Sequence, residues 1–129
     1  MPEKKQPAVL AMRQLKGEAL QFSVQEEMLA LIARVRGNKS KRTAKTLVKE
    51  GPLRVLIVAL DAGGKLEEHA VDGPFSVQCL LGKAAMRVGG QTHDLGPGGL
   101  VVVDSLVPHD LEAIEATALL ITIAAPEGK

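Results

Sequence analysis

The chain has 129 residues, an apolar share of 46% and a net charge of +1, which predicts one globular domain large enough to bury a core without disulfides. Phe22 and Phe75 are its only aromatic residues, so the core must be aliphatic, and binding of nucleic acid by stacking of bases on exposed rings is disfavoured. Cys79 is the only cysteine. No apolar run approaches the length of about twenty residues that spans a bilayer, and no hydrophobic block typical of a signal peptide follows the N-terminus. We therefore expect a cytoplasmic protein that binds neither membranes nor nucleic acid.

The N-terminal third is predicted to contain a short strand at Ala8–Met12 and then one helix. Ser23-Val-Gln-Glu26 is a capping box, in which the Ser23 hydroxyl accepts from the backbone N–H of Glu26. Apolar residues then recur at helical spacing, and Gly37 can adopt the left-handed conformation that ends a helix. We therefore predict a helix over residues 24–36. Its apolar stripe, which must pack on a sheet of this chain or on a second chain, comprises Val24, Met28, Leu31, Ile32 and Val35.

Positive charge is concentrated directly after this helix. Residues 1–50 contain eleven Lys or Arg and five Glu, whereas residues 51–129 contain five Lys or Arg and ten Asp or Glu. The densest basic cluster spans residues 34–42. A basic cluster can attract phosphate groups, but no nucleic-acid motif accompanies this one. We therefore interpret it as a solvated loop or as one side of a contact between subunits.

From Thr43 onward the sequence alternates at a period of two and is cut by turn residues, which is typical of β-strands. Leu53–Leu60 is almost entirely apolar and predicts a strand that is buried on both faces. Gly89-Gly90 fits a two-residue hairpin loop. The other predicted strands are Lys65–Val71, Phe75–Leu81, Ala84–Val88, Gln91–Leu95, Leu100–Val103, His109–Ala113 and Ala118–Ala124. Strands do not alternate with helices, so the pattern predicts an all-β sandwich or barrel rather than a parallel α/β sheet.

Two segments with glycine and histidine resemble the two motifs of the cupin superfamily, and more closely its small single-domain, RmlC-like members. In the first motif five residues separate a glycine from a histidine, as Gly63 and His69 are separated here, and Gly82 stands at the closing glycine. In the second motif, Gly98 and His109 stand at the glycine and histidine positions. The resemblance implies a double-stranded β-helix, or jelly-roll barrel, with an N-terminal α-helix. It divides the chain into an extension at 1–42, a cupin barrel at 43–124 and a tail at 125–129.

The metal-binding positions of the two motifs are only partly kept. Typical metal cupins hold an ion with three His and one Glu, whereas this chain has Val71 at the second His position and Phe75 or Ser76 at the Glu position. By this resemblance only His69 and His109 carry over as metal ligands. Tight sites for first-row metals usually have three or four protein ligands. We therefore expect no resident metal, with a divalent transition metal on the two histidines as the alternative.

We expect the two histidines to line a small-molecule cavity inside the barrel. Phe75 would fill part of its mouth, and strand alternation puts Glu67 on the same face as His69, so Phe75 and Glu67 join the histidines as predicted ligand contacts. Alternation from Phe75 makes Cys79 the best-placed further metal ligand and turns Gln78 outward. The histidines can alternatively be hydrogen-bonded core residues with unrelated roles.

The sequence leaves three functions open. The first is a small-molecule-binding cupin without a metal. The second is a metal-dependent enzyme of the dioxygenase, isomerase or decarboxylase kind, with an incomplete two-His site. The third is an interaction protein that holds a partner through the basic cluster and the helix. We expect a homodimer, because exposed edge strands invite pairing.

Overall fold

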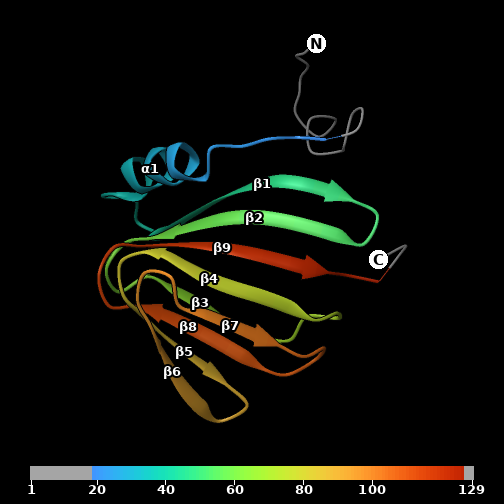
Figure 1. Ribbon diagram of the computed structural model, residues 1–129. Coiled ribbons are helices and arrows are strands. Elements are labelled where there is room, and N and C mark those ends of the chain that lie inside the picture. Colours follow the sequence, from blue (N-terminus) through green and yellow to red (C-terminus); the bar gives the residue numbers. More distant parts are fainter. Residues whose placement is uncertain (1–18, 127–129) are drawn as a thin grey trace.

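The molecule consists of two antiparallel sheets that pack face to face, with a helix on the outside of one of them (Figure 1). The structure is a computed structural model and describes residues 19–126, apart from the side chain of His69. The larger sheet has the strand order β1-β2-β9-β4-β7 and the smaller one β3-β8-β5-β6. The elements are α1 (Val24–Val35), β1 (Arg42–Glu50), β2 (Leu53–Leu60), β3 (Lys65–His69), β4 (Phe75–Leu81), β5 (Ala84–Val88), β6 (Gln91–Leu95), β7 (Leu100–Val103), β8 (His109–Ala113) and β9 (Thr117–Ala124). This is the all-β jelly roll with an N-terminal helix that the sequence predicts.

The predicted element boundaries are confirmed with small differences. α1 ends at Val35 rather than at residue 36, and β9 begins at Thr117. β3 ends at His69 rather than Val71, because the Val71 carbonyl accepts from the backbone N–H of Leu106 at 2.8 Å and so belongs to a loop contact instead of the ladder. The strand predicted at Ala8–Met12 lies outside the described residues. No helix within 19–126 has the length and apolarity needed to cross a membrane.

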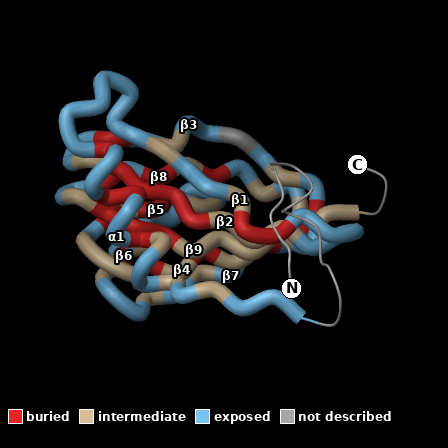
Figure 2. Tube along the Cα trace, turned by 90° about the horizontal axis from the view of Figure 1, so that it is seen from above, coloured by how far each residue is buried: buried red, intermediate tan, exposed pale blue. Residues whose placement is uncertain are grey.

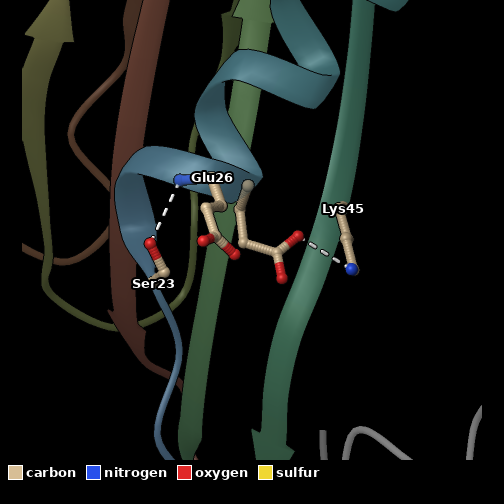
Figure 3. A network of polar contacts seen from close by, with 4 residues as sticks. Ser23, Glu26 and Lys45 are labelled. Carbon is tan, nitrogen blue, oxygen red and sulfur yellow. Dashed lines mark hydrogen bonds and ion pairs between the residues drawn. The ribbon is translucent and has the colours of Figure 1, made fainter.

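The helix α1 packs on the larger sheet of its own chain, which decides between the two partners predicted for its apolar stripe. Its N-terminus is capped by Ser23, whose hydroxyl accepts from the N–H of Glu26 at 3.2 Å, and Lys45 of β1 forms an ion pair of 2.8 Å with Glu27 (Figure 3). Four helix residues are buried, namely Met28, Leu31, Ile32 and Val35. They pack against Leu47, Ile57, Ala59 and Ala118 of β1, β2 and β9. The stripe is therefore covered within the monomer.

The main core lies between the two sheets (Figure 2). It is almost wholly aliphatic, with Leu60, Met86 and Leu119 fully buried and Phe75 as its aromatic member. Burying a side chain of this size contributes about 1.5–3 kcal/mol relative to leaving it exposed. Leu60 lies on β2, Met86 on β5 and Leu119 on β9, so the same apolar contacts hold the two sheets together.

Candidate ligand-binding cavity

An apolar cavity of about 200 Å³ lies inside the barrel, between the two sheets. Its wall is made of aliphatic side chains from both sheets, together with the Phe75 ring. His109 is the one polar side chain among the described residues that line it. The aliphatic wall includes Leu56, Val58, Val71, Val77, Leu111 and Ile121. Apart from His109, the described wall has no group that would replace the hydration of a charged ligand.

His109 is the first residue of β8 and is only 6% exposed. Its Nδ1 lies 3.0 Å from the carbonyl oxygen of Val107. A carbonyl can only accept a hydrogen bond, so Nδ1 carries a proton and donates to Val107. The Phe75 ring packs against the imidazole with centroids 4.6 Å apart and planes tilted by 48°. His109 and Phe75 therefore meet at the cavity, as the sequence predicts.

The loop between β3 and β4 forms one wall of the cavity and is held by contacts to the loop before β8. Besides the bond from Leu106 to Val71, the backbone N–H of Gly73 donates to the Ser105 hydroxyl at 2.8 Å. Gly73 has φ +124°, and a Cβ there would lie 2.4 Å from the carbonyl oxygen of Ala124, so a larger residue would displace the loop. These contacts fix where Val71 and Phe75 enter the cavity.

The position predicted for Glu67 is wrong. Strand alternation placed it on the inner face with His69, but Glu67 is exposed and lines a hollow on the outside of the smaller sheet. The reason is a β-bulge: the register pairs Leu66 with Leu111 and then His69 with His109, so one extra residue interrupts the alternation. His69 stands opposite His109 in the ladder, and its side chain lies outside the described part of the structure.

Cys79 is fully buried, as predicted, but it is not among the residues that line the cavity. Its Sγ lies 3.5 Å from the carbonyl oxygen of Leu81. Burial raises the pKa of the thiol above its ordinary value, partly offset by that backbone contact. Cys79 and His109 therefore do not line the same cavity in the described part of the structure.

The described residues do not fit the metal site of typical cupins. No group of three or more His, Cys, Asp or Glu side chains comes together within the described part of the chain. Val71 and Phe75, which stand at motif positions where a ligand is expected, line the cavity with hydrocarbon instead. Among the described residues that line the cavity, His109 is the one His, Cys, Asp or Glu side chain that could act as a metal ligand. Tight metal sites need three or four protein ligands.

Sequence reasoning did not find a second feature, a charged hollow of about 670 Å³ on the outer face of the smaller sheet. There Arg87 of β5 forms a two-pronged ion pair with Asp110 of β8, with N–O distances of 3.0 and 2.6 Å. The hydrogen bond and charge of Arg87 lower the pKa of Asp110 below its ordinary value. The two residues are direct partners in the β5–β8 ladder, so the pair could be predicted only by someone who knew the strand register.

Comparisons with known proteins agree with this architecture. No protein-family model and no curated protein matches the sequence. Among solved structures, a protein of unknown function from Streptococcus pyogenes is 27% identical, with a TM-score of 0.65 over 70% of this chain and 80% of that one. A cupin superfamily protein from Desulfitobacterium hafniense is 14% identical, with a TM-score of 0.67 over 88% and 95% of the two chains.

An enzyme is also among the similar structures. A salicylate 1,2-dioxygenase from Pseudaminobacter salicylatoxidans is 20% identical, with a TM-score of 0.68 over 77% of this chain but only 33% of the enzyme. At this identity the likeness concerns the fold. The chain has the fold of cupin superfamily proteins, including an RmlC-like cupin.

Proposed function

We propose that this protein is a small cupin that binds one small, mostly apolar molecule inside its barrel, with His109 as the polar contact. The observation that carries this proposal is the cavity of about 200 Å³, whose described lining is hydrocarbon apart from one imidazole. Pockets of this kind, apolar with few polar groups, are the usual form of small-molecule sites.

The size of the cavity limits the ligand. Sites for drug-sized molecules usually have volumes of about 300–1,000 Å³, whereas an engineered apolar cavity of about 150 Å³ accepts benzene. At about 200 Å³, this cavity suits a molecule with one ring or a short branched chain. A sugar or a nucleotide is both too large and too polar for an aliphatic wall of this size.

The polar contact defines the chemistry of the ligand further. The Nδ1–H of His109 is directed to the Val107 carbonyl, so the opposite side of the imidazole ring is the part that a ligand in the cavity would contact. A hydroxyl group on the ligand, which can both donate and accept, would bond to the imidazole while the hydrocarbon part packs against Val58, Val77 and Leu111. The ligand class that fits is therefore a monocyclic phenol or alcohol without charge.

The test is ligand-induced thermal stabilisation, measured with a panel of uncharged phenols and cyclic alcohols. A ligand that binds only the folded state raises the melting temperature with its concentration. Val71→Phe, which fills the cavity, is expected to abolish the stabilisation, whereas Val102→Phe, an equal change at a side chain that is 70% exposed on β7, is expected to keep it. If both variants respond like the wild type, the compounds bind elsewhere and the proposal fails.

A metal-dependent cupin enzyme is the second candidate, and one observation favours it. The backbone ladder places His69 opposite His109. In addition, the Nδ1 of His109 bonds to a backbone carbonyl, and metal-binding histidines usually have such a partner on the ring nitrogen that does not bind the metal. Measuring metal by elemental mass spectrometry, in protein purified without a chelator or an affinity tag, separates the candidates. Near-stoichiometric metal that is lost in a His69→Ala/His109→Ala variant would favour the enzyme, and its absence from the wild type would favour the metal-free site.

A further inference from the structure

A shallow hollow of about 330 Å³ lies on the outside of the barrel, where the loop after α1 meets the first residues of β3. Two segments that are separated by β2 bring positive charge to it. The cationic side chains of its lining are Lys41, Arg42 and Lys65, and the other lining residues are Ser40, Gly63, Gly64 and Glu67. None of these residues lines the 200 Å³ cavity inside the barrel, so the two are separate.

The side chains around this hollow have a net charge of +2. Glu67 is the one carboxylate among the described residues that line it, and because Glu67 is engaged within the chain it offsets one of the three cations. Asp61 is close in sequence, but its carboxylate accepts from the backbone N–H of Ala62 at 3.0 Å and is not part of the lining. The loop itself adds no acid, since no Asp or Glu occurs between Glu27 and Glu50. A hollow with this charge attracts anions.

The turn before β3 holds Lys41 at the hollow. The backbone carbonyl of Lys41 accepts from the N–H of Asp61 at 3.0 Å, and its ammonium group donates to the carbonyl oxygen of Ala62 at 3.4 Å. Gly64 permits this approach, because a Cβ at that position would lie 2.4 Å from the Lys41 carbonyl oxygen. Lys41 has φ +60°, which is unfavourable for a residue with a side chain. The fold therefore maintains a strained residue that directs its charge to the turn bordering the hollow.

Hydrogen bonds inside the loop fix the position of Arg42. The side-chain oxygen of Asn38 accepts from the backbone N–H of Ser40 at 3.0 Å, and the Asn38 carbonyl accepts from the N–H of Lys41 at 3.0 Å. Arg42 then donates one guanidinium N–H to the carbonyl oxygen of Lys65 at 3.4 Å. A guanidinium group has five N–H donors, so the others can donate to the oxygens of a ligand while this bond is kept.

We propose that this hollow is a second binding site, which takes the phosphate group of a small phosphate monoester. At neutral pH such a group carries nearly two negative charges, which balances the net charge of +2 around the hollow. The Arg42 guanidinium has the planar geometry that bonds two phosphate oxygens at once, and Lys41 and Lys65 add compact positive charges.

The surroundings of the hollow favour one compact anion over a polyanion. Lys65 and Glu67 also line the larger hollow of about 670 Å³, whose lining includes Glu68 and Glu112. A chain of phosphates that crossed from one hollow to the other would meet these two exposed carboxylates. A single phosphate group that stays beside the loop avoids them.

The test is a titration of the wild-type protein with glycerol 2-phosphate at constant ionic strength, followed through the backbone amide signals by two-dimensional NMR. A pH of about 8 keeps the ester doubly charged, because its second pKa is about 6. We expect saturable shifts of the amides of residues 40–42 and 63–65, with a dissociation constant in the millimolar range. Glycerol alone, which has no charge, is expected to leave these signals unchanged.

Two variants remove one cation each from the hollow. Lys41→Gln and Arg42→Gln are each expected to weaken binding of the ester about tenfold, because each loses a charge-assisted contact with the phosphate. Lys39→Gln is the matched control, since it removes the same charge from an exposed position of the same loop that does not line the hollow. At physiological salt, where charges are screened within about 8 Å, it is expected to bind like the wild type.

The absence of saturable shifts in the wild type would overturn the proposal. So would equal weakening by Lys39→Gln, since binding would then follow the overall charge of the loop, or unchanged binding in both hollow variants, since the ester would then bind elsewhere. A single-stranded oligonucleotide that displaces the ester and binds more tightly would assign the loop to a polyanion and would also overturn it. The three substituted side chains are exposed, and all variants are expected to keep the wild-type circular dichroism spectrum.

Discussion

At the scale of single residues, the sequence correctly predicted that His109 and Phe75 lie in the barrel interior and misplaced Glu67. The motif spacing and the predicted strands placed His109 and Phe75 at the cavity, and their rings lie 4.6 Å apart. Glu67 was misplaced because an inserted residue in β3 changes which face each side chain occupies. No sequence pattern in β3 or β8 indicates this bulge. The Arg87–Asp110 pair depends on which strands are neighbours, which periodicity does not reveal.

Glycine positions provide a prediction at this scale. Gly82 and Gly90 have almost the same φ, +93° and +91°, but a Cβ on Gly82 would lie 2.1 Å from the Ala116 oxygen, whereas one on Gly90 meets nothing within 4 Å. Gly90→Ala is expected to lose about 1–2 kcal/mol of unfolding free energy from the left-handed backbone alone. Gly82→Ala is expected to lose roughly 3 kcal/mol or more, because the backbone must also shift. Urea denaturation of the two variants checks this, and equal losses would contradict it.

At the scale of elements, the strands and the helix were predictable because their signals are local. Alternation at a period of two, interrupted by glycine turns, located most strands from β2 to β9 to the residue. The bulges were not predictable: in β1 both Leu47 and Val48 are buried, where alternation allows only one of them. A bulge depends on how two strands pair, so it cannot be predicted from the sequence of one strand.

The helix cap yields the prediction for an element. Ser23 accepts from the N–H of Glu26 at the exposed end of α1 (Figure 3). Ser23→Ala is expected to lower the free energy of unfolding by about 1 kcal/mol, and Ser23→Asp, which keeps an acceptor, by much less. Chemical denaturation followed by circular dichroism measures both values. A loss in the aspartate variant as large as that in the alanine variant would show that the cap bond does not hold the helix.

At the scale of the whole molecule, the fold was predictable from the sequence, whereas the interior of the barrel was not. The glycine and histidine spacing that resembles cupins led to the right barrel, because turns and strand ends determine that spacing. The same spacing does not report what fills the barrel. The volume of the cavity and the composition of its wall depend on residues from both sheets. Only the folded structure brings these residues together.

The uneven charge of the two halves of the chain has a structural meaning at this scale. The sequence placed an excess of basic residues before residue 50 and of acidic residues after it. Folding brings residues 40–42 next to Lys65 and Glu67 of β3, and all of them line one hollow of about 330 Å³. The sequence offered a subunit contact as one interpretation of the basic cluster. The hollow appears only when this cluster and the start of β3 are brought together.

The central claim is that the barrel encloses a site for a small apolar molecule. The most direct measurement is a methyl NMR titration of the wild-type protein with the uncharged phenol or cyclic alcohol that stabilises it most. We expect saturable shifts of the cavity methyl groups, those of Val58, Val77, Leu111 and Ile121, with little change at Val102 on the outer face. Shifts confined to surface methyl groups, or cavity methyl groups that do not respond at any ligand concentration, would contradict it.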